Sequence, residues 1–484
     1  MQRGKAENII SGIGWSFGER ILAQGITFIV SIVIARILSP DEYGIIALVL
    51  VFINLANVFV ANGFGESLIQ KKDATKEDFS TIFWCTFVFS ILLYVLLFIL
   101  SPLISKFYKN EGLIVLLRVL ALKIPLSSIN TIQHAYVSRN MQFRKFFFST
   151  LGGTIISGIV GIALAYTGCG VWALVAQYLV NSTIDTIVLL FTVNWHPEFI
   201  FNKNNAKIML KYAWKITGAA FINELYGQVR SLIIGKLYSP ADLAYYNKGE
   251  QFPSLIITNI SVSISKVFFP VMSNLQNDVK ELKELTRKTI KILSFVIFPL
   301  LIGLMGISQS LIIVLLTDKW LPTVPFLQIL CVYFITQPLQ SVHWQVLKAI
   351  GRSDLCLKLE ILKKVIGFVL IFSTMFIGVD ALAWSTAVFA IISMVINMIP
   401  NIKIINYSIK EQLKDISTNL IVSIIMGVIV LLLGKIQINS IVVLLLQLLF
   451  GFGSYIVMSF LLKNESLKLI HEYIKRFIKD KKIK

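Results

Sequence analysis

Fourteen apolar stretches, each long enough to cross a membrane, occupy nearly all of this 484-residue chain. A membrane-spanning helix needs about 20 predominantly apolar residues. Hydrophobic residues make up 56% of the sequence, whereas roughly 45–50% is usual for soluble domains. We therefore expect an all-α polytopic membrane protein, with spans at approximately 14–38, 43–65, 80–105, 113–137, 146–167, 171–194, 206–237, 243–271, 289–316, 324–348, 357–378, 380–402, 416–434 and 440–462.

The connections between these stretches are too short to hold a separate catalytic domain. None exceeds about 20 residues, and a domain needs about 50. Any function must therefore be carried out between helices, and we expect a protein that is not an enzyme and needs no cofactor. The four cysteines lack metal-ligand spacing, so we interpret them as small apolar packing residues and expect no metal site.

Basic residues are concentrated in alternate connections. Lysine and arginine in short loops stay on the cytoplasmic side of a membrane. The net charge of +19 is spread over many such segments, which favours a topology signal over a nucleic-acid-binding patch. We predict a multi-pass protein of the cytoplasmic (inner) membrane with both termini in the cytoplasm.

An internal repeat divides the sequence into two halves. The segment Ser39-Pro40-Asp41-Glu42 recurs as Ser239-Pro240-Ala241-Asp242, and His134 is echoed by His343. Repeated helix bundles are how many transporters build a binding site between two lobes. The repeat therefore predicts two homologous lobes and indicates transport.

The acidic pair of the first repeat has two interpretations. Asp41 and Glu42 follow a serine and a proline, which is the pattern of a capped helix start with acids at the positive end of the helix dipole. Membrane glycosyltransferases also use acids in outer loops. We favour the cap, because the second copy keeps Ser239 and Asp242, and leave a membrane glycosyltransferase or polymerase as an alternative.

Charged residues inside the spans are the candidates for function, because each costs about 2.5–3.5 kcal/mol near the bilayer centre. Cations outnumber anions seven to four among them, and an excess of Lys and Arg suits a phosphate-bearing substrate. Residues near span ends can instead extend to the membrane surface or pair locally. The candidates are Glu19, Arg20, Arg118, Lys123, Asp185, Glu224, Arg230, Lys248, Glu250, Lys266 and Lys363.

We assign two roles within this set. The predicted substrate-binding cations, lining a cavity, are Arg20, Arg118, Lys123, Arg230 and Lys248. The predicted ion-coupling residues, for a proton or sodium ion, are Glu224, Asp185 and Glu19.

Several short motifs resemble a known family. They are Gly63-Phe64-Gly65-Glu66-Ser67-Leu68-Ile69-Gln70-Lys71-Lys72-Asp73, Tyr246-Asn247-Lys248-Gly249-Glu250-Gln251-Phe252-Pro253, Val267-Phe268-Phe269-Pro270-Val271-Met272-Ser273 and Asp318-Lys319-Trp320. The chain is similar to polysaccharide flippases of the Wzx and teichuronic-acid exporter type, within the multidrug/oligosaccharidyl-lipid/polysaccharide exporter superfamily. The resemblance implies two six-helix lobes with an added helix pair.

The resemblance also sets the expected domain organisation. We expect an N-terminal lobe at 1–202, a second lobe at 203–405 and an additional pair of spans at 406–462. After it, 463–484 is a basic segment with apolar residues at helical spacing, which predicts an amphipathic helix on the anionic inner leaflet. A solvated tail is the alternative.

The function implied is the flipping of undecaprenyl-diphosphate-linked oligosaccharide units by alternating access, for cell-surface polysaccharide biosynthesis such as O-antigen or lipopolysaccharide. The implied partners are the lipid-linked oligosaccharide, membrane lipids, and a polysaccharide polymerase and glycosyltransferases. Related lipid II flippases place arginines in the first helix, in a region comparable to Glu19 and Arg20. A drug or cation antiporter on the same fold is the alternative, and it would favour acidic cavity residues.

Overall fold

The computed structural model describes residues 2–470, 472 and 475, without the side chains of residues 2–17, 19, 143, 262–263 and 265–267. Within this part every long regular element is an α-helix and no strand is present, so the predicted all-α class is confirmed. Contacts divide the chain into two compact units, Met1–Ala244 and Tyr245–Lys484. The predicted division into four segments, with its first boundary at residue 203, stays a prediction.

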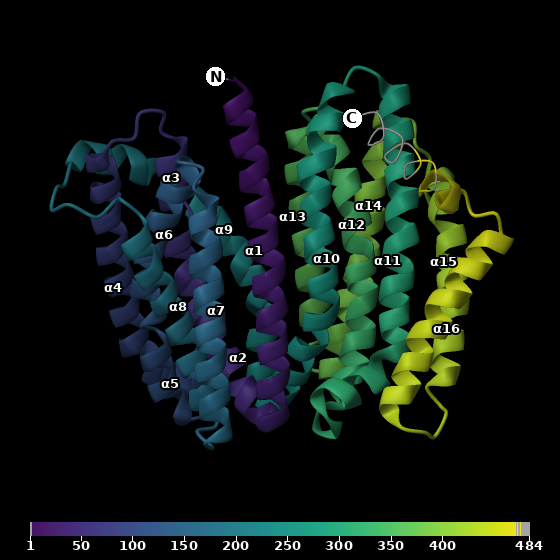
Figure 1. Cartoon of the computed structure of the whole chain (residues 1–484), viewed down its shortest axis with the longest axis horizontal. Helices are drawn as coiled ribbons and strands as arrows, with labels where there is room; N and C mark the ends of the chain where they lie inside the picture. Colours follow the sequence, from purple (N-terminus) through teal and green to yellow (C-terminus); the bar gives the residue numbers. More distant parts are fainter. Residues whose placement is uncertain (1, 471, 473–474, 476–484) are drawn as a thin grey trace. The chain divides into compact units, whose positions relative to one another are not determined.

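The first unit is built from nine helices and the first turn of a tenth. In Figure 1, α1 runs along α7, and these two helices pack together. Helix α9 packs against α2, α3 and α4. The bounds are α1 Gln2–Ile37, α2 Pro40–Ala61, α3 Phe64–Gln70, α4 Lys76–Tyr108, α5 Gly112–Leu120, α6 Lys123–Arg139, α7 Phe143–Tyr166, α8 Val171–Thr192 and α9 Lys203–Leu237.

The second unit contains the remaining helices. Helix α12 packs against α14, α11 packs against α12 and α15, and α15 and α16 lie side by side (Figure 1). The bounds are α10 Pro240–Asn274, α11 Val279–Leu316, a 3₁₀ turn η1 Asp318–Trp320, α12 Thr323–Ala349, α13 Ser353–Thr374, α14 Val379–Ile404, α15 Ile409–Leu433 and α16 Ser440–Leu461.

Ten spans in the described part are long and apolar enough to cross a membrane, which makes the protein a multi-pass membrane protein. The count of fourteen stays a prediction. Two of the expected spans are each broken into two helices: 43–65 corresponds to α2 and α3, and 113–137 to α5 and α6. The break after α2 falls at Gly63, and hydropathy alone does not detect it.

The repeated serine segments are helix caps, as predicted. Glu42 Oε2 accepts hydrogen bonds from the backbone N of Ser39 at 2.7 Å and from its Oγ at 2.9 Å. Asp242 Oδ2 does the same for Ser239, at 3.1 Å and 2.7 Å. Both carboxylates are thus occupied in caps at the starts of α2 and α10, which argues against Glu42 as a catalytic acid.

Gly63 joins α2 to α3 in a conformation that only glycine adopts readily. Its φ is +84°, and a Cβ at this position would lie 2.5 Å from the carbonyl oxygen of Ala213 in α9. Thr217 Oγ1, one turn further along α9, donates a hydrogen bond to the carbonyl of Asn62 at 2.9 Å. The α2–α3 junction is therefore held directly against α9.

In the second unit a charge cluster ties α15 to α11. Asp415 accepts hydrogen bonds from Nε and Nη2 of Arg287 at 2.7 Å and 2.9 Å, and from Tyr407 Oη at 2.8 Å. Lys291 Nζ lies 3.3 Å from Asp415 Oδ1. This pairing satisfies a carboxylate that is 6% exposed, so we interpret the cluster as structural.

The start of the predicted C-terminal tail packs on the second unit. Leu467 and Ile470 contact a buried cluster that includes Phe295, Val422 and Tyr455. The remaining apolar positions of the expected amphipathic helix, Ile474, Phe477 and Ile478, lie outside the described residues.

Candidate functional site: a polar cavity and intramembrane cations

A polar cavity of about 390 Å³ lies inside the first unit, among helices that are otherwise apolar. It is lined from α2, α3, α6 and α8. Polar groups that line a cavity at membrane depth mark an ion or substrate pathway. The lining includes Asn57, Glu66, Ser127, Asn130, Thr131, His134, Ser138, Asn181, Ser182 and Asp185.

Asp185 on α8 lines this cavity and contacts two other helices. Its Oδ2 accepts a hydrogen bond from Asn130 Nδ2 at 3.0 Å and lies 3.6 Å from His134 Nε2. Its Oδ1 accepts a hydrogen bond from Ser149 Oγ on α7. Asp185 was predicted as an ion-coupling residue, and the structure places it among three uncharged or titratable partners from two other helices.

The local packing explains how three helices meet at this carboxylate. A Cβ at Gly153 would lie 3.1 Å from the carbonyl of Asn181 and 3.6 Å from the backbone N of Asp185, so glycine permits the close approach of α7 to α8. The ring of His134 stacks on Phe146 with centroids 4.5 Å apart. Helix α6 then presents Asn130 and His134, one turn apart, on one face.

This arrangement can hold a proton or a small cation. The carboxylate of Asp185 offers oxygen ligands, and the imidazole of His134 can donate or accept a hydrogen bond. Asn130, which is 8% exposed, has an Oδ1 without a hydrogen-bond partner in the described part of the chain. A carboxylate and a free amide oxygen are the ligand types that hard cations prefer.

The matching histidine of the second repeat has a different environment. His343 on α12 is 2% exposed, and its Nδ1 lies 3.2 Å from Nδ2 of Asn401 on α14. One turn earlier, Gln340 Oε1 accepts a hydrogen bond from Asn397 Nδ2 at 3.1 Å. The second unit thus has carboxamides beside its histidine, whereas the first unit has the carboxylate of Asp185. Of the two histidine environments, the one in the first unit contains the acid.

Arg118 and Lys123 lie away from that cavity. Arg118 Nε donates to Ser101 Oγ on α4 at 2.9 Å, and its guanidinium lies 4.0 Å from the ring centroid of Phe98. Lys123 Nζ lies 5.4 Å from the ring centroid of Tyr178. Neither side chain forms an ion pair with a carboxylate within the described residues.

Arg230 on α9 is a buried cation whose guanidinium lacks hydrogen-bond acceptors within the described residues. It is 9% exposed, and its Nε and Nη2 atoms are buried without a hydrogen-bond partner among the described residues. Burying an unpaired charge is costly. Glu224, two turns earlier on α9, accepts a hydrogen bond from Gln228 Nε2 at 2.8 Å instead of pairing with Arg230.

The other predicted residues are distributed over both units. Lys248 on α10, in the second unit, is 6% exposed; its Nζ donates to Gln251 Oε1 at 3.2 Å and lies 5.8 Å from the ring centroid of Trp320. Arg20 lies half-buried on α1, and the side chain of Glu19 lies outside the described part. A common cavity for the predicted cations therefore stays a prediction.

His134, Asn130 and Ser149 are site residues that sequence reasoning missed. Histidine counts as neutral in the formal charge of the sequence, and amides and hydroxyls are uncharged, so intramembrane charge alone does not mark these residues. The repeat had already marked His134 through its echo at His343, and that signal could have identified it.

The geometry defines a multi-pass helical membrane protein with titratable groups inside its bundle. The fold matches that of the lipid II flippase MurJ in an inward closed conformation, with a TM-score of 0.73 and 18% identity, over 93% of this chain and 98% of that structure. An inward-facing multidrug resistance transporter of the MATE family, in the MOP superfamily, matches with a TM-score of 0.61 and 14% identity, over 79% and 94%. At these identities the likeness establishes the fold.

The family model for polysaccharide biosynthesis proteins matches residues 33–325, and the chain belongs to that family. It is 28% identical over 302 residues to the teichuronic acid biosynthesis protein TuaB of Bacillus subtilis (strain 168), covering 62% of each chain. It is 25% identical over 364 residues to the lipopolysaccharide biosynthesis protein WzxC of Escherichia coli (strain K12), covering 74% of this chain and 73% of that one. The family predicted from the motifs is thereby confirmed, although the match spans slightly less than two thirds of TuaB.

Proposed function

We propose that this protein flips a lipid-linked oligosaccharide from the inner to the outer leaflet of the cytoplasmic membrane, for the synthesis of a cell-surface polysaccharide. The observation that carries the proposal is membership of the polysaccharide biosynthesis family together with a MurJ-like fold. The succinoglycan biosynthesis transport protein ExoT of Rhizobium meliloti (strain 1021), 21% identical over 325 residues, is a further relative. The lipid II flippase gives the chemical precedent of a lipid-linked substrate.

The intramembrane cations suit this substrate class. Arg230 is buried with two unpaired nitrogens, and Arg118 lacks a carboxylate partner in the part described. A diphosphate would supply the missing negative charge through charge-assisted hydrogen bonds. A drug antiporter, by contrast, needs acids to attract a cationic substrate. In this role the protein makes and breaks no covalent bond. Glycosyltransferases would assemble the repeat unit before it is flipped, and a polymerase would join the units afterwards.

We assign ion coupling to the Asp185 cavity. A proton or cation bound there would be released when helices α6, α7 and α8 move relative to one another, because the carboxylate on α8 accepts a hydrogen bond from Asn130 on α6 and another from Ser149 on α7. Binding energy that differs between two conformations is what couples an ion to transport. Glu224 and Glu19 are the second choices.

Deletion and complementation test the proposal. Cells without the gene should lose surface polysaccharide and accumulate the lipid-linked repeat unit in the inner leaflet, where an externally added, membrane-impermeant glycosidase cannot reach it. Restoring the gene should return the repeat unit to the outer surface. Unchanged polysaccharide in the deletion strain, or intermediates that remain accessible from outside, would contradict the function.

A further inference from the structure

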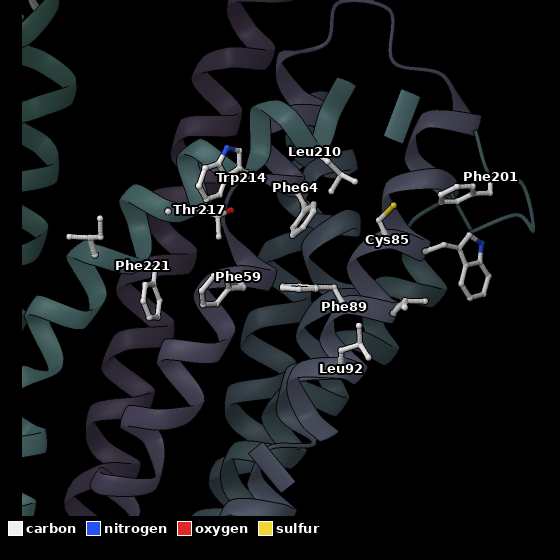
Figure 2. Close-up of a pocket in the computed structure, with 14 residues that line it drawn as sticks. Phe59, Phe64, Cys85, Phe89, Leu92, Phe201, Leu210, Trp214, Thr217 and Phe221 are labelled. Atoms are coloured by element: carbon white, nitrogen blue, oxygen red, sulfur yellow. The ribbon is translucent and has the colours of Figure 1, made fainter. Parts of the chain in front are cut away.

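A second cavity in the first unit is large and almost entirely apolar. Its volume is about 960 Å³ and it lies between the α2–α3 junction, α4 and α9. In Figure 2 the rings of Phe59, Phe64, Phe89, Trp214 and Phe221 stand around one space. Its volume is at the upper end of the roughly 300–1,000 Å³ of small-molecule sites.

Few polar groups line this cavity, and those of Thr217 and Trp84 already donate hydrogen bonds to backbone carbonyls. Thr217 is its one hydroxyl, and that hydroxyl already donates to the carbonyl of Asn62 at 2.9 Å. Cys85 contributes only a weak donor. The cavity therefore selects an apolar chain, which gains dispersion contacts with the surrounding aromatic rings.

The face of α9 that lines the cavity also carries Lys203 and Lys207. The lysines and several lining residues of α9 follow one another at intervals of three or four residues, so they share one face of the helix. Lys207 is one turn before Leu210, about 4.5 Å along the axis. Both lysines are exposed and form no ion pair within the described residues. In order along this face stand Lys203, Lys207, Leu210, Trp214, Thr217 and Phe221.

The aromatic residues at the lysine end indicate its depth in the membrane. Trp84 stacks on Phe199 with centroids 5.0 Å apart, and its Nε1 donates to the carbonyl of Glu198 at 2.9 Å. Trp and neighbouring aromatic rings with a polar contact of this kind are typical of the membrane–water interface. The lysines then lie at headgroup level, while Phe221 is about 21 Å further along α9 than Lys207.

We propose that this site binds a polyprenyl diphosphate, with the diphosphate on Lys203 and Lys207 and the first isoprene units in the aromatic cavity. This inference rests on the proposed function, since it identifies a docking place for the lipid carrier of the flipped oligosaccharide. Two lysine ammonium groups match the several negative charges of a diphosphate better than the single charge of phosphatidylglycerol. The wide, ring-lined cavity suits a branched chain.

Filling the cavity provides the direct test. A Cβ at Gly218, which lines the cavity, would meet nothing within 4 Å. Gly218→Phe therefore places a ring in the space without a backbone clash and removes a glycine from a helix interior. Gly227→Phe is the matched control, because Gly227 is also unobstructed on α9 and is not a lining residue.

Binding is measured on the full chain in phosphatidylethanolamine nanodiscs with radiolabelled undecaprenyl diphosphate, competed by phosphatidylglycerol. We expect Gly218→Phe to weaken binding at least about tenfold, and Gly227→Phe to bind like the wild type. A Lys203→Gln, Lys207→Gln double variant should lose affinity and part of the salt dependence. Lys215→Gln, an exposed lysine off this face, should not.

Two results would overturn the inference: equal binding by Gly218→Phe and wild type, or equal affinity of the wild type for phosphatidylglycerol and undecaprenyl diphosphate. Failure of the site is distinguishable from failure of the proposed function. If the site alone fails, the deletion strain still loses its surface polysaccharide and the Gly218→Phe variant restores it. If the proposed function fails, the deletion strain keeps its polysaccharide, whatever the protein binds in nanodiscs.

Discussion

Asn130 donates a hydrogen bond from its amide nitrogen to the carboxylate of Asp185, at 3.0 Å, while its own amide oxygen has no partner among the residues that the structure describes. A buried amide oxygen without a donor carries a desolvation cost, and a bound cation would remove that cost. The pair spans α6 and α8, so occupancy of this position joins two helices.

Removing the charge of Asp185 should uncouple transport. We expect Asp185→Asn to lower export of the lipid-linked unit at least about tenfold, equivalent to about 1.4 kcal/mol, and to make export insensitive to the ion gradient. The measurement is appearance of the repeat unit at the outer surface, with and without an ionophore that collapses the gradient. Glu66→Gln, which neutralises an exposed acid lining the same cavity, is the control and should respond to the ionophore like the wild type.

His134 should act through its neighbour. Its Nε2 lies 3.6 Å from Asp185 Oδ2, so His134→Gln keeps a polar side chain and removes the imidazole beside the carboxylate. We expect a smaller loss of export than for Asp185→Asn, about threefold to fivefold or about 1 kcal/mol, with a weaker response to the ionophore. His343→Gln serves as the comparison, because His343 faces a carboxamide. An equal loss of export in that variant would contradict the assignment of ion coupling to the first unit.

Arg230 should be dispensable for folding and needed for transport. Its substitution by alanine breaks no ion pair in the described part of the chain, so the amount and detergent stability of the protein should stay near wild type while surface polysaccharide falls below about a tenth. Arg230→Lys keeps the charge and loses the planar fork, so partial activity is expected. An Arg230→Ala variant that fails to accumulate in the membrane would show a structural role instead.

Gly63 should be intolerant of any side chain. Its positive φ costs an L-residue about 1–2 kcal/mol, and the 2.5 Å approach to the carbonyl of Ala213 adds a steric clash. Gly63→Ala should lower the apparent Tm in detergent by several degrees, measured by fluorescence-detected size exclusion after heating. Gly218→Ala, on α9 with open space around its Cβ, is the control and should be neutral or slightly stabilising.

The sequence was sufficient for the parts of this molecule that depend on local chemistry. Helix positions follow from the length of apolar stretches, and the caps at Ser39 and Ser239 from four consecutive residues. Asp185 could be selected because a carboxylate in an apolar span is costly wherever it lies. Its partners could not, since Ser149 and Asn130 are ordinary residues until α7 and α6 pack against α8.

The same limit applies to the lysines of α9. As basic residues beside a short connection, Lys203 and Lys207 indicate topology, which accounts for their charge. Their relation to an aromatic cavity depends on Phe59 and Phe89, which lie more than a hundred residues earlier in the chain. Hydrophobic pattern places each of these rings in a membrane, and only the packing of α2 and α4 on α9 brings them to one space.

The position of α9 has a consequence for how genes of this family can recombine. The sequence repeat predicts that α9 begins the second lobe, whereas in the structure α9 packs against α2, α3 and α4 of the first unit and contacts the Gly63 junction. A crossover at residue 202 would pair α9 of one parent with the α2–α3 surface of another. Functional chimeras should therefore be recovered with crossovers just before Ser239, where that interface is inherited whole.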